Sequence, residues 1–236
     1  MRITATNLLI SVFLICYLAE VLIFPRYEKL FYDLGFSAKA LLEGKWWCLL
    51  TSIFLHASPE HLAMNSLALF FFGHAVEEKL GKIKTLFIFF ISAIVGELFV
   101  LVLSFLNLYP FAIPTVGASA GIFGLMGVAM LVKPFEFIFY PYLIPLPLFL
   151  IGIIYALSNL LYFAYHLATG IESDISYAAH LGGLLAGIYF GLKEEREKRA
   201  LAVLLIILAI ALLPFFLEMM ENLEQINYLN IFKNLK

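Results

Sequence analysis

The sequence predicts an all-α protein, a polytopic membrane helix bundle, and two observations lead to this fold class. Of the 236 residues, 63% are apolar and only 14% are charged, whereas a soluble domain carries about 25% charged residues. The apolar residues also gather in long runs, and about 20 such residues cross a hydrocarbon core of about 30 Å as one helix. This composition excludes a disordered chain, a solvated nucleic-acid binder and an ordinary cytosolic enzyme.

Seven apolar runs, separated by charges, proline or glycine, are candidate membrane spans. The first lacks a cleavage site of small residues, so we expect it to be a retained signal anchor. The first six would form one unit, residues 1–192, and residues 193–236 would add a charged cytoplasmic linker, a further transmembrane helix and a short tail. The candidate spans cover residues 6–24, 60–77, 84–106, 117–132, 146–166, 177–192 and 200–217.

The distribution of basic residues favours a cytoplasmic N-terminus. In that orientation the lysines and arginines of the inner side lie close to span ends in short connections, where the positive-inside bias acts most strongly. Residues 25–59 then form a long outer connection. Trp46 and Trp47 favour a location of this connection in the membrane interface.

Polar residues inside spans are costly and are therefore candidates for function. His61 and Asn65 lie at i and i+4 in the second span, so both side chains share one helix face. Ser119 begins the fourth span, and His180 lies near the start of the sixth. These three spans run in the same direction, because one crossing separates each from the next. We therefore expect the four side chains at similar depth near the outer face.

The fourth span is too short to cross the hydrocarbon core. At 1.5 Å per residue it extends about 24 Å, so we expect its outer end, with Ser119, to be sunken at the floor of a cavity. Stripes of glycine predict close contact between the fourth and sixth spans, which would bring Ser119 toward His180. These glycines are Gly117, Gly121, Gly124 and Gly127 in the fourth span and Gly183, Gly187 and Gly191 in the sixth.

The four polar residues together could perform acyl transfer. A serine hydroxyl is a weak nucleophile unless a base accepts its proton, and His180 could be that base for Ser119. The side chains of His61 and Asn65, and the Ser119 backbone N–H, are candidate donors to the oxyanion that forms. We expect a dyad, because the nearest carboxylates that could orient His180 fall in the loop before the sixth span, at Glu172 and Asp174.

Several motifs across the first six spans resemble those of rhomboids, the family of intramembrane serine proteases. Each motif alone is weak, but together they are highly specific. They are Phe54-Leu55-His56, His61-x-x-x-Asn65, the segment Ala-Val-Glu-Glu-Lys-Leu-Gly at 75–81, Gly117-Ala118-Ser119 with Ile122-Phe123-Gly124-Leu125, and Ala179-His180-Leu181-Gly182-Gly183.

The resemblance implies a rhomboid-like six-helix core, with the seventh span as the family's common extra helix. It implies that Ser119 is the nucleophile, His180 the base, and His61 and Asn65 side chains of the oxyanion hole, with Phe123 packed on the His180 ring. It also implies a serine endopeptidase in the cell membrane that needs no cofactor or metal. Its partners would be transmembrane protein substrates and the lipid bilayer, and not nucleic acid.

Two departures from the family pattern are visible in the sequence. The family usually has glycine directly after the serine, whereas this chain has Ala120 there and glycine at Gly121. The outer connection usually reads Trp-Arg, whereas Trp47 is followed here by Cys48. Neither departure removes a group that the chemistry requires.

Other readings of these residues remain. Alone, Ser119 would be read as a packing residue in a glycine-rich helix. The main rival function is a catalytically inactive rhomboid-like protein that binds membrane clients, although such relatives characteristically lack the serine or the histidine. A metalloprotease would need a motif such as His-Glu-x-x-His, and a transporter would need paired interrupted helices. The sequence shows neither pattern, so we set both alternatives aside. We expect a loop-supporting role for His56 and a structural or solvent-facing role for His74 and His166. Glu97 is expected to be a hydrogen-bonded structural carboxylate.

The substrate's route to a sunken serine requires a gate. The loop 167–176 and a tilt of the fifth span away from the second are the candidates. Substrates would then be membrane proteins whose spans carry helix-destabilising, small residues near the outer end.

Overall fold

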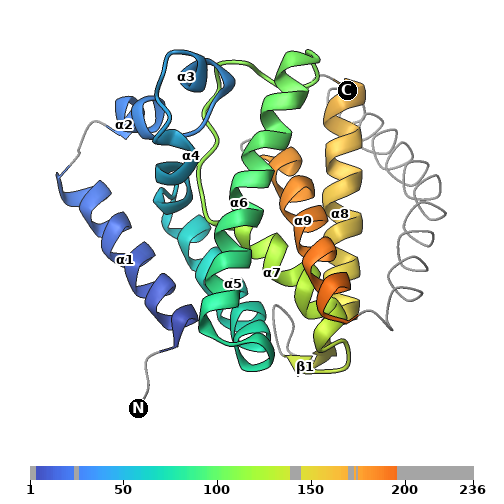
Figure 1. Cartoon of the computed structure of the whole chain (residues 1–236). Coiled ribbons are helices and arrows are strands. Elements are labelled where there is room, and N and C mark those ends of the chain that lie inside the picture. Colours follow the sequence, from blue (N-terminus) through green and yellow to red (C-terminus); the bar gives the residue numbers. More distant parts are fainter. Residues whose placement is uncertain (1–3, 24–26, 139–144, 170–172, 174, 196–236) are drawn as a thin grey trace, which may run out of the picture.

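The computed structural model describes residues 4–23, 27–138, 145–169, 173 and 175–195, which form a helical bundle (Figure 1). Long helices occupy the first six predicted runs, within a few residues of the predicted bounds. The seventh run, and nearly all of residues 193–236, lie outside the described residues. The long helices are α1 (Ala5–Ile23), α5 (Pro59–Leu80), α6 (Lys82–Phe105), α7 (Ser119–Val132), α8 (Leu148–Thr169) and α9 (Tyr177–Glu194).

Three of the described helices, α1, α6 and α8, are long and apolar enough to cross a membrane, and α7 is a shorter apolar helix. This agrees with the predicted class of helical membrane bundle. The number of spans, six plus one, stays a prediction.

Helix α7 lies at the centre of the bundle and contacts α5, α6, α8 and α9. Nearly every residue of α7 after Ser119 is buried. Figure 1 shows the connection from α6 running down from the upper end of the bundle before α7 begins. The helix starts at Ser119, two residues later than predicted, so the serine sits at the top of a helix that begins partway down the bundle.

Local sequence explains where the helices begin and end. Helix α5 begins after Ser58, whose side chain accepts a hydrogen bond from the His61 N–H, and Pro59 takes the first helical position. The N-terminus of α1 is capped from another helix. The Glu77 carboxylate of α5 accepts hydrogen bonds from the backbone N–H groups of Ala5 and Thr6, at 2.8 and 2.9 Å.

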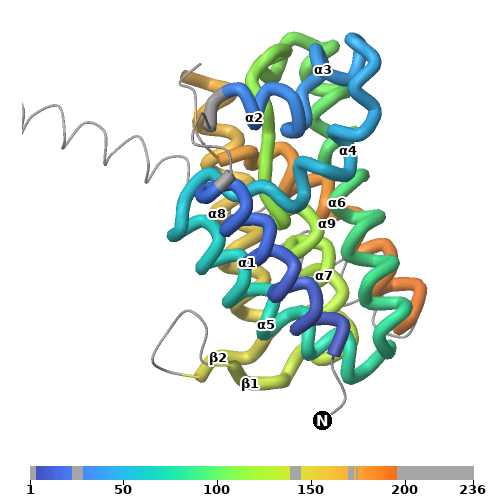
Figure 2. Tube along the Cα trace, turned by 90° about the vertical axis from the view of Figure 1, so that its left-hand side faces the viewer, coloured from blue at the N-terminus to red at the C-terminus, as the bar shows by residue number. Residues whose placement is uncertain are grey.

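The connection between α1 and α5, for which the sequence predicted a location in the membrane interface, is largely helical. It folds over the upper end of the bundle (Figure 2). The backbones of Phe36 and Thr115 pair there, which joins this connection to the segment that precedes α7. The short helices are α2 (Tyr27–Leu34), α3 (Ala38–Leu42), α4 (Cys48–Thr51) and a 3-10 turn, η1 (Ser52–Phe54).

At the opposite end, two short antiparallel strands, β1 (Phe137–Ile138) and β2 (Leu146–Pro147), connect α7 to α8. The sequence analysis did not predict these strands.

Candidate active site

Ser119 and His180 lie in direct contact at the top of α7 and α9. The Nε2 atom of His180 is 2.7 Å from the Oγ atom of Ser119. The Phe123 ring, one turn further along α7, stacks on the imidazole with a centroid separation of 4.3 Å and an interplanar angle of 12°. The imidazole is therefore held against α7 on its flat face while its edge meets the serine.

Close helix packing explains why two residues 61 positions apart meet. A Cβ atom at Gly183 would overlap the carbonyl oxygen of Ala120, and one at Gly187 would overlap that of Gly124. Only glycine at these positions lets the α7 and α9 backbones approach so closely. The predicted contact between the glycine stripes is thus present in the structure.

The backbone that leads into Ser119 requires glycine at position 117. Gly117 has a φ of +118°, which side chains rarely adopt, and its N–H donates to the carbonyl oxygen of Ser52 at 2.8 Å. A Cβ atom here would lie 2.7–2.8 Å from the ring atoms Cε1 and Nε2 of His61. The His61 ring consequently packs directly on the backbone two residues before Ser119.

His61 presents an N–H group to this backbone. Its Nδ1 accepts a hydrogen bond from the Ala57 N–H at 3.4 Å, so the proton of the neutral ring belongs on Nε2, the atom beside Gly117. Asn65, one turn deeper and buried, brings its Nδ2 group to the same glycine. The structure therefore gathers all four predicted site residues around the segment 117–119, with His61 and Asn65 at Gly117 and His180 at Ser119.

Asn159 of α8 is a site residue that the sequence analysis missed. Its Oδ1 lies 2.9 Å from the His180 Nδ1, and its Nδ2 donates to the carbonyl oxygen of Tyr177 at 2.9 Å. From the sequence we considered only carboxylates as groups that could orient His180. A buried polar residue in an otherwise apolar span was the signal that could have found Asn159.

Glu97 of α6 holds the two segments above the site. Its carboxylate accepts hydrogen bonds from the hydroxyls of Ser52, at 3.3 Å, and Thr115, at 2.7 Å. Ser52 in turn holds the Gly117 N–H, and Thr115 pairs with Phe36. This geometry agrees with the predicted structural role of Glu97 and makes it an anchor of the entry to α7.

The two departures from the family pattern occupy buried, packed positions. The Ala120 methyl group would approach a Cβ at Gly96 within 2.8 Å, so it packs in the contact between α6 and α7. Cys48 begins α4 and is fully buried. Burial raises the pKa of the Cys48 thiol, which keeps it neutral, as a packing residue would be.

The other histidines lie outside the contact between Ser119 and His180. His56 is buried between the rings of Phe13 and His61. His74 lies toward the far end of α5, where its Nδ1 contacts the Phe70 carbonyl oxygen. His166 stacks on Tyr177.

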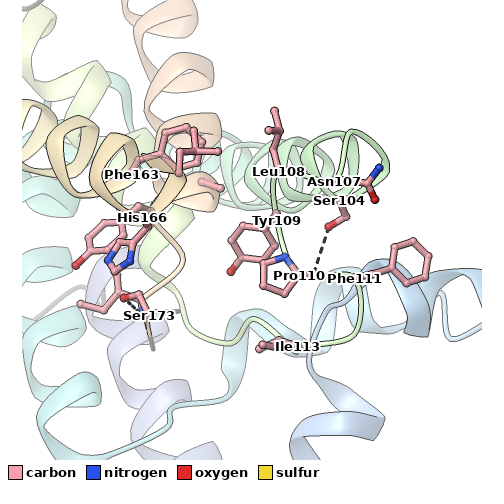
Figure 3. Close-up of a pocket in the computed structure, with 14 residues that line it drawn as sticks. Ser104, Asn107, Leu108, Tyr109, Pro110, Phe111, Ile113, Phe163, His166 and Ser173 are labelled. Atoms are coloured by element: carbon pink, nitrogen blue, oxygen red, sulfur yellow. Dashed lines mark hydrogen bonds between the residues drawn. The ribbon is translucent and has the colours of Figure 1, made fainter. Parts of the chain in front are cut away.

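A cavity of about 420 Å³ lies beside the site, between the upper ends of α6 and α8 (Figure 3). The rings of Tyr109, Phe163, His166 and Tyr177 line it, and the Tyr109 hydroxyl donates to Ser176, the N-cap of α9. Neither Ser119 nor His180 lines this cavity. It is therefore a neighbouring feature, which meets the site at the start of α9.

In the part of the chain that the structure describes, no group of three or more His, Cys, Asp or Glu side chains is arranged to hold a metal ion.

Comparison with known proteins supports a family assignment. A family model described as the Rhomboid domain matches residues 43–197. YdcA of Bacillus subtilis (strain 168), which carries a rhomboid protease name, is 35% identical over 71% of this chain and 75% of its own length. Rhomboid protease GluP of the same organism is 33% identical, over 66% of this chain but only 28% of that longer protein.

Not every relative carries a protease name. Inactive RHOMBOID-like protein 8 of Arabidopsis thaliana is 37% identical over 39% of this chain and 25% of its own length. The matched domain, which includes every residue of the site described above, and the apolar helices together indicate a multi-pass membrane protein. The chain belongs to the rhomboid family.

Proposed function

We propose that this protein is an intramembrane serine protease of the cell membrane that cleaves peptide bonds in or near the spans of membrane proteins. The observation that carries the proposal is the 2.7 Å contact between the Ser119 Oγ and the His180 Nε2. Family membership supports the same class of activity, because homologues bear rhomboid protease names.

The proposed reaction begins with proton transfer from the Ser119 hydroxyl to the Nε2 of His180. The Oγ attacks the scissile carbonyl carbon, and the carbonyl oxygen becomes an oxyanion. When this tetrahedral intermediate collapses, the C–N bond breaks and His180 returns the proton to the leaving amine. Water, activated by the same histidine, then hydrolyses the acyl-enzyme ester and restores Ser119.

The oxyanion would be bound from the side opposite His180. The His61 Nε2–H, the Asn65 Nδ2–H and the Ser119 backbone N–H are the proposed donors. The tautomer of His61 and the approach of both side chains to Gly117 support this assignment. Because these donors are fixed before the reaction, they need no reorganisation when the charge develops.

The test is cleavage of a single-span model substrate by purified protein in liposomes. We expect Ser119→Ala and His180→Ala each to reduce cleavage to background, and the double variant to be no worse, because both residues serve one route. Ser11→Ala is the matched control and should keep full activity, because the Ser11 hydroxyl lies in another span and donates to the Asn7 carbonyl oxygen. Near-normal turnover by either site variant would refute the dyad.

The oxyanion donors should show smaller effects than the dyad. We expect His61→Ala and Asn65→Ala each to lower the rate by about 10²–10³-fold. Unchanged activity in both variants would remove them from the site.

Substrates are proposed to enter laterally between α5 and α8. Cysteines engineered into these helices, in a background without Cys16 and Cys48, allow crosslinking of the two. Under lateral entry the crosslink should suppress cleavage of a transmembrane substrate more than that of a short soluble peptide. Equal rates for both, with and without the crosslink, would exclude this route.

The second candidate function is the binding of membrane clients without catalysis. A relative whose name describes it as inactive supports this alternative. Under this function, the wild-type protein would retain model substrates without cleaving them, and Ser119→Ala would change nothing. The retained serine and histidine, in hydrogen-bond contact, favour the protease.

A further inference from the structure

Two hydrogen bonds fix the orientation of the Asn159 side-chain amide, and this orientation determines which nitrogen of His180 carries a proton. Its amide bridges the Tyr177 carbonyl oxygen and the His180 ring, at 2.9 Å on each side. A carbonyl oxygen can only accept, so the NH2 group must face Tyr177 and the Oδ1 must face His180. The Oδ1 can only accept as well, so the Nδ1 of His180 must carry a proton.

This proton placement leaves the other ring nitrogen ready to act as a base. A neutral imidazole carries one proton, and with that proton on Nδ1 the Nε2 lone pair points at the Ser119 hydroxyl, 2.7 Å away. In the opposite tautomer Nε2 would carry a hydrogen and could not accept the serine proton. Asn159 therefore selects the reactive form of His180 without adding a charge.

The position of Asn159 also gives α8 a role in the site. Ser119 and His180 lie on α7 and α9, which are joined by glycine contacts, whereas Asn159 comes from α8. Its side chain is almost fully buried against α9, at 4% exposure. A shift of α8 away from α9 would break both of its hydrogen bonds and release the His180 ring.

We propose that Asn159 is a positioning residue that fixes His180 as the Nδ1–H tautomer and ties the reactivity of Ser119 to the packing of α8 against α9. This deepens the proposed function and rests on it. The imidazolium that forms during attack keeps its hydrogen bond to the Oδ1, and hydrogen bonds to charged groups are stronger than neutral ones. Loss of Asn159 should therefore slow the chemical step more than it weakens substrate binding.

The test compares Asn159→Leu and Asn159→Asp with Ser158→Ala, a control one residue earlier on α8. Leucine keeps the approximate size but offers no acceptor, so kcat should fall about 10–100-fold with little change in KM. Labelling of Ser119 by a fluorophosphonate probe should slow by a similar factor. Ser158→Ala should match the wild type in both assays.

Asn159→Asp tests the contact between residue 159 and the His180 ring. A carboxylate opposite Nδ1 favours the charged imidazolium, so the acidic limb of the pH profile of kcat should move to higher pH. A limb that stayed in place would show that residue 159 does not act on the His180 ring during turnover. Because aspartate retains the size and an acceptor, this variant keeps the proposal testable if Asn159→Leu does not fold.

A spectroscopic readout does not depend on cleavage. In protein with ¹⁵N-labelled histidine, the His180 signal, assigned by its loss in His180→Ala, should report the Nδ1–H tautomer in the wild type and a mixture in Asn159→Leu. Unchanged kinetics and tautomer in Asn159→Leu, or an unmoved acidic limb in Asn159→Asp, would overturn the role of Asn159. Wild-type protein that neither cleaves nor reacts with the probe at Ser119 would instead refute the proposed protease.

Discussion

The contact between α7 and α9 and the contact between α8 and α9 are built differently. In the first, Gly183 and Gly187 bring one backbone against another, so that neither helix can shift without a steric clash or a gap. In the second, α8 is less embedded: 28% of its apolar stretch is buried, against 44% for α6. Ser119 and His180 thus share the tightly packed pair, and Asn159, which contacts His180, comes from the less buried helix.

Under the proposed function, this difference separates two requirements of the chemistry. Ser119 and His180 need a constant distance, which close backbone packing provides in a bilayer, where no hydrophobic force drives helices together. The proposed lateral entry of a substrate needs a helix that can move. The hydrogen bond that the His180 Nδ1–H donates to the Asn159 Oδ1 links α8 to the site, so a movement of α8 away from α9 would release the His180 ring.

The largest expected effect comes from adding one methyl group between α7 and α9, and a methyl group added where α8 meets α7 is the comparison. At Gly187 a Cβ would strike the Gly124 backbone, which cannot yield, so Gly187→Ala should separate α7 from α9. We expect a destabilisation of about 1–3 kcal/mol and loss of most activity. At Gly152 of α8 the Cβ would meet the flexible Met130 side chain, so Gly152→Ala should be mild.

Thermal unfolding in detergent and the fluorophosphonate labelling rate measure both variants. Equal losses in Gly187→Ala and Gly152→Ala would mean that α8 is packed on α7 as tightly as α7 is packed on α9.

The second effect concerns Glu97, which belongs to the packed region but acts on the segments above it. Glu97→Leu removes the acceptor for Ser52 and Thr115, so the entry to α7 should loosen and kcat should fall by about tenfold or more. Glu97→Gln can still accept from one hydroxyl and donate to the other, so it should retain most activity. If kcat falls as far in Glu97→Gln as in Glu97→Leu, then Glu97 does not support activity through its hydrogen bonds.

How far the sequence predicts this site depends on what sets each contact. The apolar runs and the common direction of three spans were enough to bring Ser119 and His180 together, because helix order and glycine spacing determine that contact. Asn159 is visible in the sequence as a polar residue in an apolar span, but its partner is set by the rotation of α8 about its own axis, which no run of apolar residues reveals. The strands β1 and β2 are two residues long, below the length at which alternation gives a signal.

The third effect is a pH dependence of stability centred on His56, in the connection before α5. Burial, with a smaller contribution from the neighbouring His61, lowers the pKa of His56 to about 4. In the unfolded chain the pKa is about 6.5, so only the unfolded state takes up this proton between these values. The His56 contribution to folding should therefore be complete above about pH 6.5 and should be lost progressively as the pH falls toward 4.

Melting temperatures measured from pH 7.5 to 4.5 test this. His56→Gln, which cannot titrate, should lose less stability over the range than the wild type does. Parallel curves for the two proteins would remove His56 as a source of the acid sensitivity.

The smallest effect is expected at an ion pair that joins α9 to another of its neighbours, α6. The Lys84 Nζ of α6 lies 2.9 Å from both carboxylate oxygens of Glu194 at the end of α9. The lysine side chain is 56% exposed, so water and salt screen the attraction, and such pairs contribute about 0–1 kcal/mol. Lys84→Ala should therefore change the melting temperature slightly and leave labelling of Ser119 unchanged. If glycine contacts hold α6 and α9 together, raising the salt concentration should also have little effect on the melting temperature. A loss in Lys84→Ala as large as that in Gly187→Ala would mean that charge, and not backbone packing, holds this part of the bundle together.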